Sequence, residues 1–380
     1  MKKKYIIFSL VTLVLLVALI TSFNYFKTTN TYIDDSVNNQ TKITKGISMN
    51  LEQTAGAGDY KTVTQSGWPT EGYKFNAELS RCENGSTLSW DDTKKAVIVS
   101  GNLSDKCYVY FDKILTLAEY VISQYTGTQG SNGIYYHNST LANGAGDNSY
   151  RYAGASASVN NYICLGSDAT VCPDANLFRI IGVFGDKTKV IRAKTVGNKG
   201  WRTSADNTWS SSSLNTYLNG EYLTSLGTLA DKIATTTCKV GGGSWANIGT
   251  SVPKTAYQYE VGSNASRTTY EAKIGLMYVS DYYYGASASA WTLVGYDSSV
   301  KTNDYRKVTS INWLYLGSAE WTISRIENES YPFDAFTINS GHEYYERVIS
   351  SIGARPTFNL LSSTTYVSGS GTMSDPIVIN

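Results

Sequence analysis

Few side chains of this 380-residue chain have the types and spacing that acid–base, nucleophilic or metal chemistry requires. Its two histidines, His137 and His342, do not have the spacing of a zinc-binding motif. Serines are numerous, but no Gly-x-Ser-x-Gly segment supports a Ser-His-Asp triad. The glycines at 241–243 lack the lysine of a phosphate-binding loop. We therefore predict no catalytic residue, no metal-binding residue and no cofactor.

Calcium is the one cofactor that stays an alternative. Asp281, Asp304 and Asp334 carry the oxygen ligands that this ion prefers. The chain has no EF-hand-like series of acids, however, so the sequence does not define a specific calcium site.

The five cysteines fall into two close sets and a single residue. Cys82 and Cys107 are 25 positions apart, and Cys164 and Cys172 are eight apart across a turn-rich segment. In an exported protein, both sets are credible disulfides. Cys238 is left over. We interpret it as a small buried hydrophobe, with a reactive thiol as the alternative.

An aromatic group at the start of a long segment without apolar periodicity is the candidate ligand-binding site. Its members are Tyr282, Tyr283, Tyr284 and Trp291. Aromatic rings can stack on the face of a sugar, while tyrosine hydroxyls hydrogen-bond to its rim. Core packing is the alternative for these four residues. It is the favoured interpretation for the tryptophans at 209, 313 and 321.

The first 27 residues decide on which side of a membrane these side chains act. Residues 5–26 are uncharged and mostly apolar, and they follow three lysines. As a helix rising about 1.5 Å per residue, this run spans about 33 Å, enough to cross a hydrocarbon core of about 30 Å. The lysines should stay cytoplasmic, which places the later residues outside the cell. We predict a retained single-pass anchor in the lipid bilayer, although a cleaved signal peptide is the alternative.

The charge of the remaining chain argues against a nucleic-acid partner. Residues 1–27 hold four of the 32 basic residues and none of the 31 acidic ones, which leaves a net charge of −3 beyond them. Charged residues make up only 17% of the chain, whereas there are 30 tyrosines. Hydroxyl and amide groups must therefore solvate much of the surface, as is common outside cells.

Composition and periodicity divide the exported part into three. Residues 28–46 are polar and predict a stalk. Residues 47–113 predict a small disulfide-clipped all-β module with a type I′ turn at Asn84-Gly85. Its predicted strands are 47–51, 72–75, 86–90, 96–99 and 107–111. Residues 114–380 predict an α+β domain with mixed and antiparallel sheets.

Two short helices and several strands are predicted in residues 114–380. One helix covers 114–125, and a second starts near 209 and is interrupted or ended by Asn219-Gly220. The strands are 134–136, 161–164, 177–184, 188–192, 273–279, 312–316, 320–323 and 355–360, with a hairpin around Gly185-Asp186. Two long segments, 239–269 and 282–311, are predicted as loops that meet the ligand.

Several stretches of residues 115–380 resemble exported surface proteins of gut-type Gram-positive bacteria (Firmicutes) that carry a domain of unknown function. These stretches are 161–167, 177–184, 209–219, 273–282, 353–356 and 369–376. Residues 47–112 resemble a β module often found ahead of that domain. The layout and the late Gly-x-Arg-Pro also resemble the C-type-lectin-like fold shared with formylglycine-generating enzymes. The cysteine pair of those enzymes and the Glu-Pro-Asn motif of calcium-dependent lectins are absent from this sequence.

The sequence therefore predicts a membrane-anchored extracellular binding or adhesion protein. Its expected ligand is a glycan or a protein on a host or neighbouring surface. An envelope oxidase or hydrolase on a formylglycine-generating-enzyme-like scaffold is the first alternative, and it requires clustered acids or a reactive Cys238. A structural component of the envelope is the second alternative.

Overall fold

The computed structural model describes residues 46–64, 67–69, 72–102, 104–167, 169, 171–204, 206–241, 243–262, 268–296, 309–327, 333–339 and 342–380. The chain divides into two compact units, Met1–Leu115 and Thr116–Asn380, which we describe separately. The predicted membrane helix, 5–26, and all of the predicted stalk except Gly46 lie outside the described residues. Within the described ranges, no helix is both long and apolar enough to cross a bilayer.

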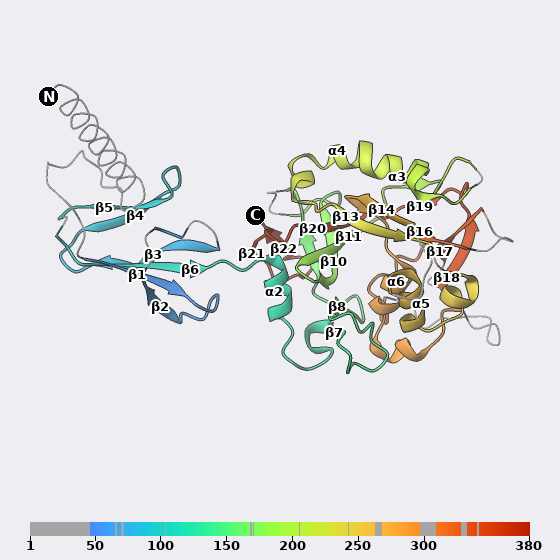
Figure 1. Ribbon diagram of the computed structural model, residues 1–380, viewed down its shortest axis with the longest axis horizontal. Coiled ribbons are helices and arrows are strands. Elements are labelled where there is room, and N and C mark those ends of the chain that lie inside the picture. Colours follow the sequence, from blue (N-terminus) through green and yellow to red (C-terminus); the bar gives the residue numbers. More distant parts are fainter. Residues whose placement is uncertain are drawn as a thin grey trace, which may run out of the picture. The chain divides into compact units, whose positions relative to one another are not determined.

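The described part of the first unit contains strands and turns but no helix (Figure 1). The strands are β1 (Ile47–Glu52), β2 (Tyr60–Val63), β3 (Tyr73–Cys82), β4 (Thr87–Asp91), β5 (Ala96–Ser100) and β6 (Cys107–Lys113). Four of them form a sheet in the order β2-β1-β6-β3, in which β1 and β6 run parallel. β4 and β5 form a separate antiparallel hairpin.

The core of the first unit follows the two-residue period of β1 and β6. Met49 and Leu51 are buried on β1, and Val109 and Phe111 are buried on β6. Alternate residues of a strand share one face, so these four side chains form a single apolar surface. Val97 of β5 packs against it. The rings of three further residues lie 5.7–5.9 Å from that of Phe111, namely Trp68, Phe75 and Trp90.

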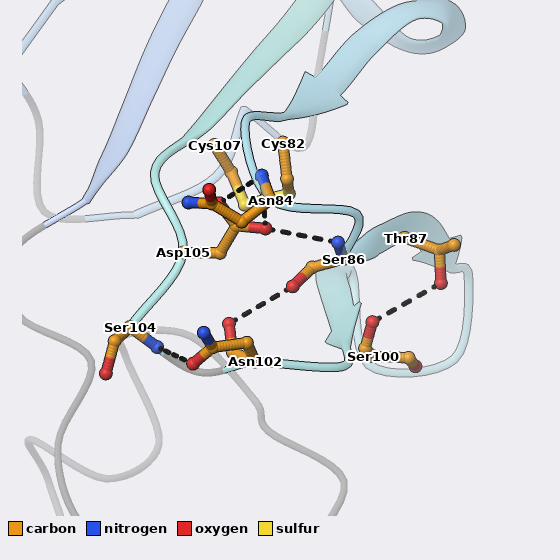
Figure 2. The surroundings of a disulfide bond; sticks show 9 residues. All are labelled: Cys82, Asn84, Ser86, Thr87, Ser100, Asn102, Ser104, Asp105 and Cys107. Atoms are coloured by element: carbon orange, nitrogen blue, oxygen red, sulfur yellow. Dashed lines mark hydrogen bonds between the residues drawn. A yellow bond between two sulfur atoms is a disulfide. The ribbon is translucent and has the colours of Figure 1, made fainter.

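A disulfide joins Cys82 and Cys107 where the ends of β3 and β6 pair (Figure 2). Their Cα atoms are 4.0 Å apart. The second predicted disulfide, Cys164–Cys172, is present in the other unit with a Cα separation of 5.8 Å. Both predicted cysteine pairs are therefore confirmed.

The turn after β3 differs from the prediction. Asp105 accepts hydrogen bonds from the backbone N–H groups of Asn84 and Ser86 at 2.8 and 3.1 Å (Figure 2). Gly85 has a φ of 86°, but Asn84 does not have a positive φ. A type I′ turn needs positive φ at both central residues, so that prediction is wrong. The carboxylate of Asp105 holds this turn, which leads the chain from the sheet into the β4–β5 hairpin.

Two larger sheets and one small hairpin form the second unit (Figure 1). Its strands are β7 (Ile134–Tyr136), β8 (Tyr150–Tyr152), β9 (Tyr162–Cys164), β10 (Leu177–Phe184), β11 (Lys187–Arg192), β12 (Asn198–Lys199), β13 (Thr236–Val240), β14 (Thr268–Ala272), β15 (Ile274–Gly275), β16 (Glu320–Arg325), β17 (Asp334–Asn339), β18 (His342–Arg347), β19 (Ile352–Gly353), β20 (Thr357–Leu360), β21 (Tyr366–Ser368) and β22 (Ile377–Ile379). One sheet has the order β15-β20-β11-β10-β9-β22-β21, and β8 joins it at β10 and pairs with β7. The second has the order β12-β19-β16-β17-β18, and β13 pairs with β14 alone.

The β10–β11 hairpin occupies the centre of the larger sheet. The first seven residues of β10 are all buried, which explains why all of them except Arg179 are apolar or glycine. Gly185, with a φ of 65°, turns the chain directly into β11, and the predicted hairpin is confirmed. β22 lies between β9 and β21 and runs parallel to β9.

Short helices pack around these sheets. They are the α-helices α2 (Leu117–Ser123), α3 (Ser213–Tyr217), α4 (Leu223–Ser225), α5 (Pro253–Glu260) and α6 (Val279–Gly285), the π-helical turns η3 (Leu218–Tyr222) and η5 (Trp245–Gly249), and the 3₁₀ turns η1 (Ser131–Gly133), η2 (Trp209–Ser211), η4 (Gly227–Lys232) and η6 (Ala288–Thr292). Thr116 and Glu119 form a capping box, so α2 begins three residues later than predicted. Ser212 caps α3, and the predicted interruption at Asn219-Gly220 is the π-helical turn η3.

Two predicted strands and two predicted loops differ from the structure. Of the predicted strand 273–279, only Ile274–Gly275 pairs, because Asp281 accepts a hydrogen bond from the Tyr278 N–H at 2.9 Å and starts α6. The predicted strand 312–316 is a turn in which Asn312 donates to the Tyr282 carbonyl at 3.1 Å. The described parts of the two predicted loops contain η5, α5, η6 and most of α6.

The fold is mixed α+β, as predicted, with more than the two short helices expected. The finer assignment to a C-type-lectin-like fold stays a prediction.

Replacing both Cys82 and Cys107 with serine should destabilise the first unit. The bond closes a 25-residue separation, which corresponds to about 3.5 kcal/mol of denatured-state chain entropy. Hydrogen exchange followed by mass spectrometry should show faster exchange in β3 and β6 of the variant. Unchanged exchange in these strands would contradict a stabilising role of the bond.

Candidate functional site

The predicted aromatic binding group is buried. Tyr282, Tyr283, Tyr284 and Trp291 are each at most 1% exposed. The first three lie on α6, and Trp291 lies on η6, where a loop was predicted. No face of these rings can stack on a ligand in this conformation, so core packing, the alternative, describes them. The favoured interpretation of Trp209, Trp313 and Trp321 as core residues is also confirmed.

Two of these rings enclose His137. The imidazole lies 4.8 Å from the Tyr284 ring and 5.1 Å from the Trp291 ring, between ring centroids. Its Nδ1 accepts a hydrogen bond from the Ala145 N–H at 3.0 Å. Burial, assisted by the positive charge of Arg151, lowers the pKa of His137 well below its usual 6.5. The side chain is therefore held in its neutral form.

Arg151 lies beside this histidine in a buried ionic cluster. Its Nη2 is 2.6 Å from Asp147 Oδ2, and its Nε donates to Ser149 Oγ at 2.8 Å. Its guanidinium is 5.1 Å from the centre of the Tyr257 ring, whose hydroxyl donates to Asp147. Burial opposes ionisation of Asp147, but Arg151, Ser149 and Tyr257 outweigh burial and lower its pKa to about 2. Both members of this ion pair are therefore charged at neutral pH.

Cys238, the remaining cysteine, is a free, half-buried thiol on β13. Burial raises its pKa to about 11, which opposes formation of the thiolate at neutral pH. This environment favours the small-hydrophobe interpretation over a reactive thiol.

No group of three or more histidine, cysteine, aspartate or glutamate side chains within the described residues could hold a metal ion. Asp281, one of the three candidate calcium ligands, lies 2.5 Å from Lys189 Nζ instead. Asp304 is outside the described residues.

A small surface pocket lies where η2, β13, β14 and β16 meet. It encloses about 250 Å³, including its open mouth, and is lined by Thr208, Trp209, Ser210, Val240, Thr268, Tyr270 and Arg325. Asn207 positions one wall by donating to the carbonyls of Ile326 and Asp334 at 2.9 and 3.0 Å. Val240 and Thr268 are paired opposite each other in the hairpin. We take this pocket as the candidate functional site.

Two residues of the pocket wall have N–H groups without a partner. Trp209 Nε1 and Arg325 Nε are buried and meet no acceptor in the part of the chain that the structure describes. Leaving such a donor unsatisfied costs about 1–3 kcal/mol. Trp209 is held by the Trp201 ring at 4.9 Å, and Arg325 Nη2 pairs with Glu327 at 2.7 Å. The pocket therefore combines an aromatic wall and hydroxyl groups with two buried donors in its wall, which an external acceptor reaches only if the wall moves.

The sequence indicated one part of this pocket. Val240 and Thr268 belong to the segment 239–269, which was expected to meet the ligand. Arg325 was missed, since nothing near it in the sequence indicates that it faces Trp209, 116 positions earlier.

Comparison with protein-family models, curated proteins and solved structures yields no match. The resemblance to exported Gram-positive surface proteins and to C-type-lectin-like domains therefore stays a prediction.

Replacing His137 with asparagine should weaken the loss of stability in acid. The unfolded chain takes up a proton near pH 6.5 but the folded chain does not, so the free energy of unfolding falls as pH decreases below 6.5. The fall is up to about 1.4 kcal/mol for each pH unit. Urea unfolding at pH 7.5, 6.5 and 5.5 should show a smaller fall in the variant, while equal falls would contradict a neutral buried His137.

Replacing Asp147 with asparagine should cost about 3–5 kcal/mol at pH 7, because Arg151 would stay buried without its carboxylate. The folded pKa of Asp147 is about 2 against 3.8 in a free chain, so this advantage of the wild type is lost as pH falls from 3.8 towards 2. Urea unfolding of both proteins across this range measures it. Asp174, in an exposed ion pair, is the control, and Asp174→Asn should cost under about 1 kcal/mol. Equal costs for the two variants would contradict this account.

Proposed function

We propose that this chain is a membrane-anchored protein that binds a ligand outside the cell, and that the pocket between η2, β13, β14 and β16 is its binding site. The apolar segment 5–26 supports the anchor, and the two disulfides are in keeping with an oxidising exterior. A C-type-lectin-like fold for the second unit is part of this proposal. The expected ligand is a glycan or a protein of a host or neighbouring cell surface.

One observation carries the assignment of the site. Trp209 and Arg325 line the same pocket, and each has a buried N–H without an acceptor among the described residues. Sugar hydroxyls, carboxylates and peptide carbonyls are acceptors, whereas an apolar ligand would leave both donors unsatisfied.

The enzyme alternative is less well supported. The oxidase version requires a reactive Cys238, but burial raises the pKa of this thiol to about 11. The ion-paired carboxylates Asp147 and Asp281 do not line the pocket, so they are poorly placed to act on a bound molecule there.

A glycan array and a surface-protein pull-down with the purified chain test this proposal. Trp209→Phe keeps an aromatic ring against Trp201 but removes the indole N–H, and it should weaken binding about 5- to 10-fold, the worth of about one hydrogen bond. Trp90→Phe in the first unit is a matched control and should leave binding unchanged, since Trp90 does not line the pocket. Absence of any ligand above background, or equal binding by Trp209→Phe, would refute the proposed site.

A further inference from the structure

A lysine and an aspartate meet in the interior of the second unit. Lys189 Nζ on β11 lies 2.5 Å from Asp281 Oδ2 on α6, and their side chains are 12% and 3% exposed. The two residues are 92 positions apart in the sequence. This contact is therefore a tertiary link between the central hairpin of the larger sheet and a helix.

The surroundings of this contact exclude most water. Aromatic rings cover the lysine, with Nζ 4.9 Å from the centre of the Tyr278 ring and 5.5 Å from that of Phe184. Charged groups are expensive to hold in such a place, because burial removes their hydration. Any reaction that removes both charges together would relieve that cost.

Asp281 lies closer to Lys189 than to Arg151, the other positively charged side chain near it. Arg151 Nη1 is 3.9 Å from Asp281 Oδ1, but Arg151 has a closer carboxylate in Asp147, at 2.6 Å. Glu260 is buried beside the start of α6, where it accepts the N–H groups of the residues at 279 and 280 at 3.0 and 2.8 Å. Burial raises the pKa of Glu260, whereas the groups that donate to it act in the opposite direction.

We propose that Lys189 and Asp281 condense into an intramolecular amide, an isopeptide bond. The ammonium first passes a proton to the carboxylate across their hydrogen bond. The free amine of Lys189 then attacks Asp281 Cγ, a carbon–nitrogen bond forms, and one carboxyl oxygen leaves as water with two protons. One ammonium and one carboxylate thus give one amide and one water, without an oxidant, a reductant or a cofactor.

Peptide mapping of the purified full chain by mass spectrometry tests the bond directly. A digest of the wild type should contain a branched peptide that joins the Lys189 and Asp281 segments, about 18 Da lighter than the sum of its two linear parts. Trypsin should also fail to cut after Lys189, since the enzyme requires a free side-chain charge.

Lys189→Arg is the matched variant, because it keeps the positive charge but has no amine that can form this bond. It should yield only the linear peptides, and it should unfold at a lower temperature than the wild type. Recovery of the linear peptides alone from the folded wild type, with cleavage after Lys189, would overturn the proposal and leave the contact as an ion pair. This outcome is independent of ligand binding at the pocket.

Discussion

The stability of the second unit depends on protein groups that replace the water lost by its buried charged side chains. Arg355 is paired with Glu320, at 2.7 Å between Nε and Oε2 and 2.8 Å between Nη2 and Oε1, and both side chains are nearly inaccessible. Arg179 has no such carboxylate among the residues that the structure describes. It donates to Asn161 Oδ1 at 2.7 Å and to carbonyls of residues 159 and 313. Burial lowers its pKa to about 10. Removing Glu320 would leave the charge of Arg355 buried without its carboxylate, which costs far more than the intact pair contributes.

These buried charges also determine which segments meet. Arg355 follows β19 and precedes β20, and its guanidinium donates to the carbonyl of Leu314 while it pairs with Glu320 at the start of β16. One side chain thus joins both sheets to the turn at 312–316. The Gly-x-Arg-Pro at 353–356 is therefore explained by a structural role of its arginine.

Local patterns in the sequence predicted what local physics determines. The turn at Gly185 and the spacing of the cysteines each involve neighbouring residues or simple strand pairing, and each is present. The segment 273–279 was misassigned because a short apolar run fits a strand and a buried helix start equally well. The pocket forms because tertiary contacts, such as those of Asn207, bring Trp209 and Arg325 together. Contacts between residues so far apart leave no periodic pattern in the sequence, so they could not be predicted. The aromatic residues at 282–284 were predicted to bind a ligand but are buried. Composition alone does not indicate whether an aromatic ring faces the interior or the solvent.

The parallel pairing of β22 with β9 has a consequence for biosynthesis. Ile377 lies opposite Ile163, so the partner of an early strand is made more than 200 residues later. Until the ribosome has passed this point, β9 exposes one edge with unpaired backbone groups to whatever surrounds the nascent polypeptide. The unit is thus expected to stay dependent on chaperones until its translation is nearly finished, and truncations that omit β22 should be prone to aggregate.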